Sequence, residues 1–535
     1  MEETQAYAEL NKRWKAACRI VLGGEVGELR EFEGWLDSAN EPMEHLPSSI
    51  SGKEISFGEC EYAAGSKRIG FSEIDFGKKF APVSINEMKD LDSIVAAVAE
   101  RAYYCGNIIL GNSKFVERSS NVTDSFYIYN SSFVSDSKYA AYCSYLRYAE
   151  DVFGTTNDVY SKILIRGLDT HKTPRSLELC GTYMCPDAYF SSRCMDCHDC
   201  MFSFNLKAKS YCVGNFALER DKYLGIKQKL LEEMRQELHA HKKLPSLIEI
   251  VANSKSYATE NRKILAQMAN EAAEKDEKTD MAPVEKAFEK ASAIVLGKSL
   301  GGMQKYENWL LGHVKSIKTA KSAASGRRVS VGMFMPYCNY PQERMLRIAE
   351  GWKAGESLSL SAQDAEEISF GGVGDSIGKI AYFVPEARLR ENANLIDTAL
   401  AYNSQNCYKG GIYSQAKYCG CSFWPRESEH MFGCDTAFSS SFCLHTYFSN
   451  NITRSFEVDA SRNCSGSYFL HNCENVQDSM FCFNVKNLRN AIGNSALPAE
   501  KFTTIKNALV GQMHAELEKK KELKTGIYNI GAGQV

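Results

Sequence analysis

The sequence lacks the features that mark several large classes of protein. No stretch approaches the roughly eighteen apolar residues of a membrane-spanning helix, and the first residues carry no apolar run typical of a signal peptide. The 63 basic side chains nearly balance the 66 acidic ones, so the net charge of −3 provides no overall field to attract nucleic acid. We therefore expect a soluble, cytoplasmic protein that binds neither membranes nor DNA.

Motifs of catalysis are missing as well, because neither HExxH nor GxSxG occurs in the chain. The segment Gly371–Lys379 (GGVGDSIGK) resembles a phosphate-binding loop. It lacks the first glycine at the required spacing, and Ile380 replaces the required Ser or Thr. We expect no catalytic residue and no cofactor, and therefore a protein that is not an enzyme.

What the sequence does contain is a period of twelve residues. Four units share an initial Asn and a small residue four places later: Asn451 and Ser455, Asn463 and Ser467, Asn475 and Ser479, Asn487 and Ala491. Earlier units begin at Asn394, Asn406, Tyr418 and His430. Between the two series the phase breaks, and we expect a protruding loop or an expanded coil at 438–450.

This period predicts stacked coils of chain. Twelve residues are too few for a pair of helices, but they suit one coil of a narrow β-solenoid whose coils lie about 4.8 Å apart. Small residues fit its tight inward corners, and Asn tolerates left-handed turns and can bond to its stacked neighbour. An ordinary β-sandwich with coincidental spacing is the alternative.

The chain also contains two copies of one plan. Three pairs of short segments lie 274 residues apart: IVLG at 20–23 and 294–297, WL at 35–36 and 309–310, and SG at 51–52 and 325–326. The first copy carries the same ladder. Its units begin at Asn121, Phe133, Tyr145 and Asn157 and, after a slip of three residues, at Lys172, Met184, Asp196 and Ala208.

We therefore predict an α+β protein with an internal duplication. Each copy has a helical or mixed N-terminal part (1–117 and 284–393) and a β-solenoid (118–215 and 394–494). A C-terminal helix closes each solenoid (216–243 and 495–524) and covers its open strand edge. A helical linker at 244–283 joins the copies, and residues 525–535 form a tail.

The nineteen cysteines offer a possible metal site. Cys194, Cys197 and Cys200 have a two-residue spacing that suits zinc or an iron–sulfur cluster, and Cys212 could join them. Cys200 and Cys212 are twelve residues apart, however, so they belong in adjacent coils, where cysteine serves as a small apolar residue. We expect no metal here; a metal site and stacked disulfides are the alternatives.

Two local basic clusters are the best candidates for contact with RNA phosphate: Arg327 and Arg328, and Lys519, Lys520 and Lys521. Such clusters are more often only solvated faces.

The segments FSFNLKAKSYCVGN (202–215) and FCFNVKNLRNAIGN (481–494) carry a resemblance. They resemble a group of conserved proteins from archaea and candidate-phyla bacteria, whose Cys- and Asn-rich repeats end in FxFN(L/V)(K/R)…GN before a helix. The resemblance covers each solenoid and its closing helix. The bacterial relatives begin with a zinc-ribbon-like segment that has no equivalent here, so no metal role carries over. In size, duplication and lack of catalytic motifs the chain is also similar to an archaeal ribosome dimerisation (hibernation) factor.

Three hypotheses for function follow: an interaction scaffold, a β-helix carbohydrate-active enzyme, and a metal or iron–sulfur protein. Carbohydrate-active β-helices cluster carboxylates for acid–base chemistry, whereas the acids here are spread over different ladder positions in the two copies. What both copies share is packing. We therefore favour a non-catalytic scaffold that forms a homodimer and binds the small ribosomal subunit or another large ribonucleoprotein.

Overall fold

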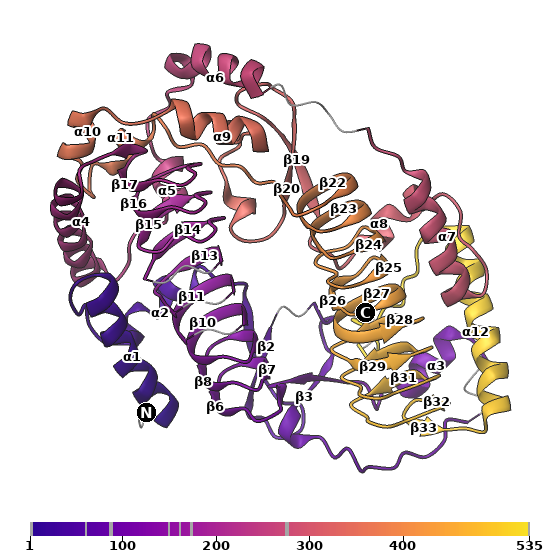
Figure 1. The fold of residues 1–535 in the computed structure, drawn as a ribbon. Helices are drawn as coiled ribbons and strands as arrows, with labels where there is room; N and C mark the ends of the chain where they lie inside the picture. Colours follow the sequence, from indigo (N-terminus) through magenta and orange to yellow (C-terminus); the bar gives the residue numbers. More distant parts are fainter. Residues whose placement is uncertain are drawn as a thin grey trace.

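The chain folds around two large sheets whose strands run almost entirely parallel. The structure is a computed structural model, and it describes residues 4–58, 61–84, 89–147, 150–159, 162–171, 175–272 and 278–532. We call the sheet at 109–217 stack 1 and the sheet at 387–496 stack 2. Figure 1 shows them side by side with helices on their outer flanks. The predicted combination of helices with many parallel strands is confirmed.

Both stacks are built from short strands. Those of stack 1 are β5 (Ile109–Leu110), β6 (Lys114–Glu117), β7 (Ser120–Thr123), β8 (Phe126–Tyr129), β9 (Ser132–Ser135), β10 (Lys138–Arg147), β11 (Glu150–Val159), β12 (Lys162–Leu164), β13 (Gly167–His171), β14 (Leu177–Cys180), β15 (Ala188–Ser192), β16 (His198–Met201), β17 (Ser210–Val213) and β18 (Phe216–Ala217). Those of stack 2 are β21 (Ala387–Leu389), β22 (Ala393–Tyr402), β23 (Gln405–Ser414), β24 (Lys417–Gly420), β25 (Glu429–Phe432), β26 (Asp435–Phe438), β27 (Ser441–Thr453), β28 (Phe456–Asp459), β29 (Arg462–Ser465), β30 (Tyr468–His471), β31 (Met480–Phe483), β32 (Ala491–Ile492) and β33 (Ser495–Ala496).

Most neighbouring strands are offset by twelve residues along the chain, while pairs at the ends of the stacks depart from this offset. In stack 2 the paired positions run Gln405, Lys417, Glu429 and Ser441. In stack 1 they run Thr156, Leu168, Cys180, Ser192 and Phe204 without interruption. The three-residue slip expected in the first copy was therefore wrong.

The loop expected at 438–450 was also wrong. Phe438 pairs with Asn450 in the ordinary parallel register, and β27 continues through Thr453. The reason is a shorter period, because nearly every third residue of the stack has a positive φ: Asn451, Arg454, Glu457, Ala460 and Asn463 are examples. Each twelve-residue step contains four such triplets. A shift of three residues moves the pattern by one triplet and leaves the packing unchanged.

The residue after each positive φ points into the stack. Ile452, Ser455, Val458 and Ser461 are all buried in this way. The inward-pointing serines form hydrogen bonds between successive twelve-residue steps of the stack. The Ser455 hydroxyl donates to the Thr453 carbonyl at 2.8 Å and accepts the Ser467 backbone N–H at 3.3 Å, and Ser467 accepts the Ser479 N–H at 3.2 Å. Each hydroxyl thus accepts the backbone N–H of the serine twelve residues later, which would otherwise be buried without a partner.

Helices cover the outer faces. α1 (Gln5–Val21) packs on stack 1 and α7 (Ala282–Leu296) on stack 2. Helices α4 (Arg220–His241) and α12 (Ala499–Lys520) lie where the closing helices were predicted. That they cover the open strand edges stays a prediction. The other helices are α2 (Glu33–Asp37), α3 (Leu91–Val98), α5 (Leu247–Ala252), α6 (Ala258–Ala272), α8 (Glu307–Leu310), α9 (Ile348–Ser357), α10 (Ala362–Glu367) and α11 (Val373–Ile377). The remaining strands form three pairs: β1 (Met43–Pro47) with β2 (Glu54–Gly58), β3 (Lys67–Gly70) with β4 (Tyr103–Gly106), and β19 (Ile317–Lys321) with β20 (Arg328–Gly332).

The two halves of the chain clasp each other. Residues 61–84 and 89–108 belong to the first half but pack against stack 2, where Asn484 donates a side-chain hydrogen bond to the Tyr103 carbonyl at 2.7 Å. Residues 345–384 belong to the second half but pack against stack 1, where Asn205 donates to the Tyr382 carbonyl at 2.9 Å. The β19–β20 pair packs against β22 and β23 of stack 2, in its own half. The domain boundaries drawn from the sequence at 117 and 393 stay predictions, and the hydrophobic packing crosses both.

The segment predicted as a tail contributes to the core. Ile527 and Ile530 are fully buried among side chains of stack 2 and α12, while residues 533–535 lie outside the described residues. Within the described parts of the chain, no helix is both long enough and apolar enough to cross a membrane.

Candidate functional site

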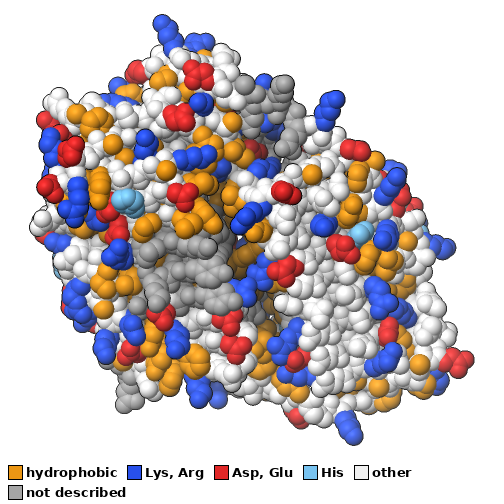
Figure 2. Space-filling view, in the orientation of Figure 1, with side chains coloured by type: hydrophobic (Ala, Val, Ile, Leu, Met, Phe, Trp, Pro, Cys, Tyr) orange, Lys and Arg blue, Asp and Glu red, His pale blue; other side chains and the backbone are white. Residues whose placement is uncertain are grey.

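A cleft of about 470 Å³ lies between the two stacks. Figure 2 shows the surface hollowed along the seam between the two bodies of the molecule. One wall is a single row of outward side chains from stack 2, each twelve residues after the last: Phe438, Asn450, Arg462, Glu474 and Lys486. At the usual strand spacing this row is about 19 Å long. It presents a ring, an amide and three charges in a fixed order.

The charges of this row neutralise one another. Glu474 lies 2.6 Å from the Arg462 guanidinium and 2.9 Å from the Lys486 ammonium. Burial opposes ionisation of Glu474, but the two cations prevail and lower the pKa of its carboxyl. On the stack 1 side, the exposed Asp136 adds a second carboxylate to the lining. Two cations and two anions leave the cleft with no net charge.

Phenyl rings from both stacks meet at the cleft. Phe133 of stack 1 and Phe448 of stack 2 are stacked, with ring centroids 4.8 Å apart and planes at 24°. Phe438 lies under the Arg426 guanidinium at 4.2 Å. These three rings are half-buried, so part of each faces the open space.

Asparagine amides supply hydrogen-bonding groups beside the rings. The predicted bonds between stacked asparagines are present: Asn451 donates to Asn463 at 2.9 Å, and Asn475 donates to Asn487 at 3.0 Å. Asn463 and Asn450 are exposed and line the cleft. An amide both donates and accepts, so it suits a ligand with hydroxyl groups.

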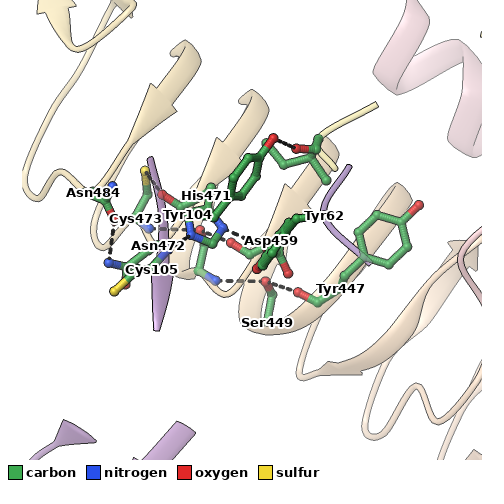
Figure 3. A network of polar contacts seen from close by, with 12 residues as sticks. Tyr62, Tyr104, Cys105, Tyr447, Ser449, Asp459, His471, Asn472, Cys473 and Asn484 are labelled. Carbon is green, nitrogen blue, oxygen red and sulfur yellow. Dashed lines mark hydrogen bonds and ion pairs between the residues drawn. The ribbon is translucent and has the colours of Figure 1, made fainter. Parts of the chain in front are cut away.

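A buried polar network lies behind the cleft (Figure 3). Asp459 accepts hydrogen bonds from the Tyr62 hydroxyl and from Nδ1 of His471, both at 2.8 Å. The backbone N–H of Cys105 donates to Nε2 of His471 at 2.8 Å. Because Nε2 accepts, the ring carries its proton on Nδ1 and is neutral. A cavity of about 10 Å³, the size of one water, is lined by Tyr62 and Asp459 and shares several lining residues with the cleft.

A second buried pair fastens the C-terminal segment. His445 Nδ1 lies 2.6 Å from Glu457 Oε1, and Glu457 Oε2 accepts the backbone N–H of Ile527 at 2.6 Å. The Trp309 ring lies 4.3 Å from the His445 ring. His445 and Glu457 belong to stack 2, Trp309 to α8 and Ile527 to the C-terminal segment, so the pair joins stack 2 to α8 and to the chain end.

Stack 1 has the same arrangement with different chemistry. Arg166 takes the place of the histidine and lies 3.1 Å from Glu178, with Trp35 beneath its guanidinium at 5.5 Å. Burial raises the pKa of Glu178, while Arg166 and the Leu247 N–H lower it. An arginine cannot act as an acid–base group at neutral pH. Because the same position holds a histidine in stack 2 and an arginine in stack 1, we infer that both pairs stabilise the fold and do not take part in catalysis.

The two predicted basic clusters are not one site. Arg327 and Arg328 lie at the β19–β20 hairpin and Lys519–Lys521 at the end of α12, which Figure 1 places apart. Arg328 forms an ion pair with Asp397 at 2.9 Å. Lys520 pairs with Glu516 at 2.8 Å, and Lys521 lies 3.1 Å from the Tyr306 hydroxyl.

The structure does bring the candidate metal ligands together. Cys194, Cys197, Cys200 and Cys212 lie in one buried apolar cluster of stack 1. The thiol of Cys197 donates to the Met195 carbonyl at 3.3 Å, and the others make similar backbone contacts. In the described residues, no group of three or more His, Cys, Asp or Glu side chains has the arrangement of a metal site.

Burial favours the protonated form of three thiols of stack 2. Burial raises the pKa of Cys443 and of Cys482 to about 12, and that of Cys464 to about 11. A protonated, buried thiol is a poor nucleophile and a poor metal ligand. These cysteines act as small packing residues.

The segment that resembles a phosphate-binding loop lies elsewhere, in a second pocket of about 410 Å³. Glu237, Glu249 and Asp375 line this pocket together with Gly371, Gly372 and Gly374. The three carboxylates oppose a bound phosphate, which agrees with the missing residues of the motif.

The search of family models, curated proteins and solved structures found no match to this chain. The assignment of the cleft as a candidate functional site therefore rests on its geometry alone. The sequence alone did not lead us to predict the row from Phe438 to Lys486. Its twelve-residue spacing would have indicated the row if Asn450 had been recognised as an outward-facing residue.

Proposed function

We propose that the protein is a non-catalytic interaction scaffold made of two β-solenoids, and that its halves descend from one duplicated unit. The twelve-residue register of both stacks supports the solenoids. The matching contacts of Asn205 with Tyr382 and of Asn484 with Tyr103 support the duplication.

The observation that carries the proposal is the reciprocal clasp. Each half covers the other half's stack, so the cleft and both outer faces are fixed relative to one another. Asp459 and His471, the buried pair behind the cleft, are bonded to Tyr62 and to the Cys105 backbone. They hold the clasp closed, and a rigid display surface is what a scaffold needs.

The partner we propose is a large ribonucleoprotein such as the small ribosomal subunit, met in the cytoplasm by a homodimer of this chain. The similarity to ribosome dimerisation factors supports this partner. Arg327 and Lys519, both exposed, provide local positive charge that the whole chain lacks. The carbohydrate-active enzyme is less well supported because Glu474 is held by two cations, and the iron–sulfur protein because the cysteines are buried in apolar surroundings.

Affinity purification from the native cell followed by gradient sedimentation tests this function. The protein should travel with ribosomal subunits at low salt and leave them at high salt, because counterion release weakens phosphate contacts. The double variant Arg327→Glu/Lys519→Glu should sediment alone, while the control Lys12→Glu, on exposed helix surface, should behave as the wild type. A wild-type protein that stays at the top of the gradient in growing and in starved cells would refute the ribosomal partner.

A further inference from the structure

We propose that the cleft between the stacks binds a neutral, extended oligosaccharide. This inference goes beyond the scaffold function and is independent of the ribonucleoprotein partner. It depends on four features of the cleft: its charge balance, its rings, its amides and its regular spacing.

The charge balance excludes a phosphate-rich ligand. A groove for single-stranded nucleic acid needs unpaired cations along the backbone. Here Arg462 and Lys486 both bind Glu474, at 2.6 and 2.9 Å, and Asp136 lies in the same lining. A neutral ligand leaves these ion pairs intact and can accept hydrogen bonds from the cations and donate to the carboxylate.

The rings and amides match the two kinds of surface on a sugar. Phe438 and Phe448 offer half-buried rings to the apolar C–H face of a pyranose. Phe133 is stacked between Tyr145 and Phe448 and therefore supports the Phe448 ring. Asn450 and Asn463 offer exposed amides to the hydroxyl groups of the sugar. The Asn463 oxygen also accepts a hydrogen bond from Asn451, so Asn463 offers chiefly its N–H donors. The backbone of both walls is already paired within the stacks, so a peptide could not add as a strand here.

The spacing of the row suits a polymer. Successive side chains from Phe438 to Lys486 rise by one strand spacing, about 4.8 Å, which is close to the length that one pyranose adds to an extended chain. The row therefore spans about four sugar units. The ligand class that fits is a neutral, extended oligosaccharide of about this length or longer.

Isothermal titration of the full-length protein with cellohexaose, xylohexaose, mannohexaose and maltohexaose tests the proposal. At least one of the four should bind. The variant Phe438→Ala should weaken that binding about three- to tenfold, as expected for loss of one aromatic contact. The matched control is Phe115→Ala, which removes an exposed ring of stack 1 outside the cleft and should leave the affinity unchanged. Thermal melting of both variants checks that they fold.

A second variant separates sugar from RNA. Glu474→Gln removes the counter-charge of Arg462 and Lys486 and weakens an acceptor for hydroxyl groups. An oligosaccharide should then bind more weakly, whereas a single-stranded oligouridylate would bind more tightly. The proposal is overturned if none of the four hexasaccharides binds, if Phe438→Ala leaves their binding unchanged, or if wild-type protein binds oligouridylate more tightly than every sugar.

Discussion

Removing Arg166 should destabilise the protein strongly and in a pH-dependent way. Arg166 is 6% exposed and Glu178 is fully buried, and their charged atoms lie 3.1 Å apart. The variant Arg166→Met leaves the carboxylate without its cation. Breaking a buried pair in this way typically costs about 3–5 kcal/mol.

The pH dependence follows from the direction of the pKa shift. Burial already raises the pKa of Glu178 above its ordinary value, and without Arg166 it should rise further. The folded variant therefore binds more protons than the unfolded chain, so stability present at low pH is lost as pH rises through the folded pKa. The destabilisation should be smaller at pH 5 than at pH 8.

Urea unfolding followed by tryptophan fluorescence measures both effects, since Trp35 lies over the Arg166 side chain. The double variant Arg166→Met/Glu178→Leu should recover most of the lost stability, because a buried ion pair can be replaced by apolar side chains. The control Arg175→Met breaks an exposed pair with Asp187 and should cost no more than about 1 kcal/mol. A loss below that value for Arg166→Met, or one that does not change between pH 5 and pH 8, would refute the reasoning.

Three further predictions concern the core. The variant Ser467→Ala leaves the buried N–H of Ser479 without an acceptor and should cost about 1–3 kcal/mol in urea unfolding; no change would mean that the serine row does not bind the levels together. A chain that ends at residue 525 loses the fully buried Ile527 and Ile530 and should be destabilised by at least about 4 kcal/mol, whereas an unchanged urea midpoint would show that the segment is dispensable. Elemental analysis should find no stoichiometric metal at the cluster around Cys197, and about one zinc or several irons per chain would contradict this.

The twelve-residue register was predictable because it depends on local steric demands. Only small side chains fit where Ser455, Ser467 and Ser479 stack, and that demand leaves a visible pattern in the sequence. The three-residue period within it was missed. Positive φ favours Asn, but here it is also imposed on side chains such as Phe133 and Tyr145, whose aromatic character hid the rule.

The contacts between the two halves and the position of the cleft could not be predicted from a local sequence pattern. Asn205 and Tyr382, or Cys105 and His471, are joined only by the folded chain, and no local pattern announces contacts between residues so far apart. The cysteines of stack 1 were correctly grouped by spacing, because residues twelve apart are neighbours. The cleft could not be predicted before both stacks were placed relative to each other, because its lining residues Phe133 and Phe448 come from different halves.

The central claim is that two clasped halves form one rigid scaffold, and cutting the chain between them tests it most directly. A protease site placed between residues 272 and 278 allows the halves to be separated covalently after folding. Residues 61–84 and 89–108 lie against stack 2, and residues 345–384 lie against stack 1. The cleaved halves should therefore elute together from a size-exclusion column at micromolar concentration and part only in denaturant. Elution as two separate folded fragments would contradict the account.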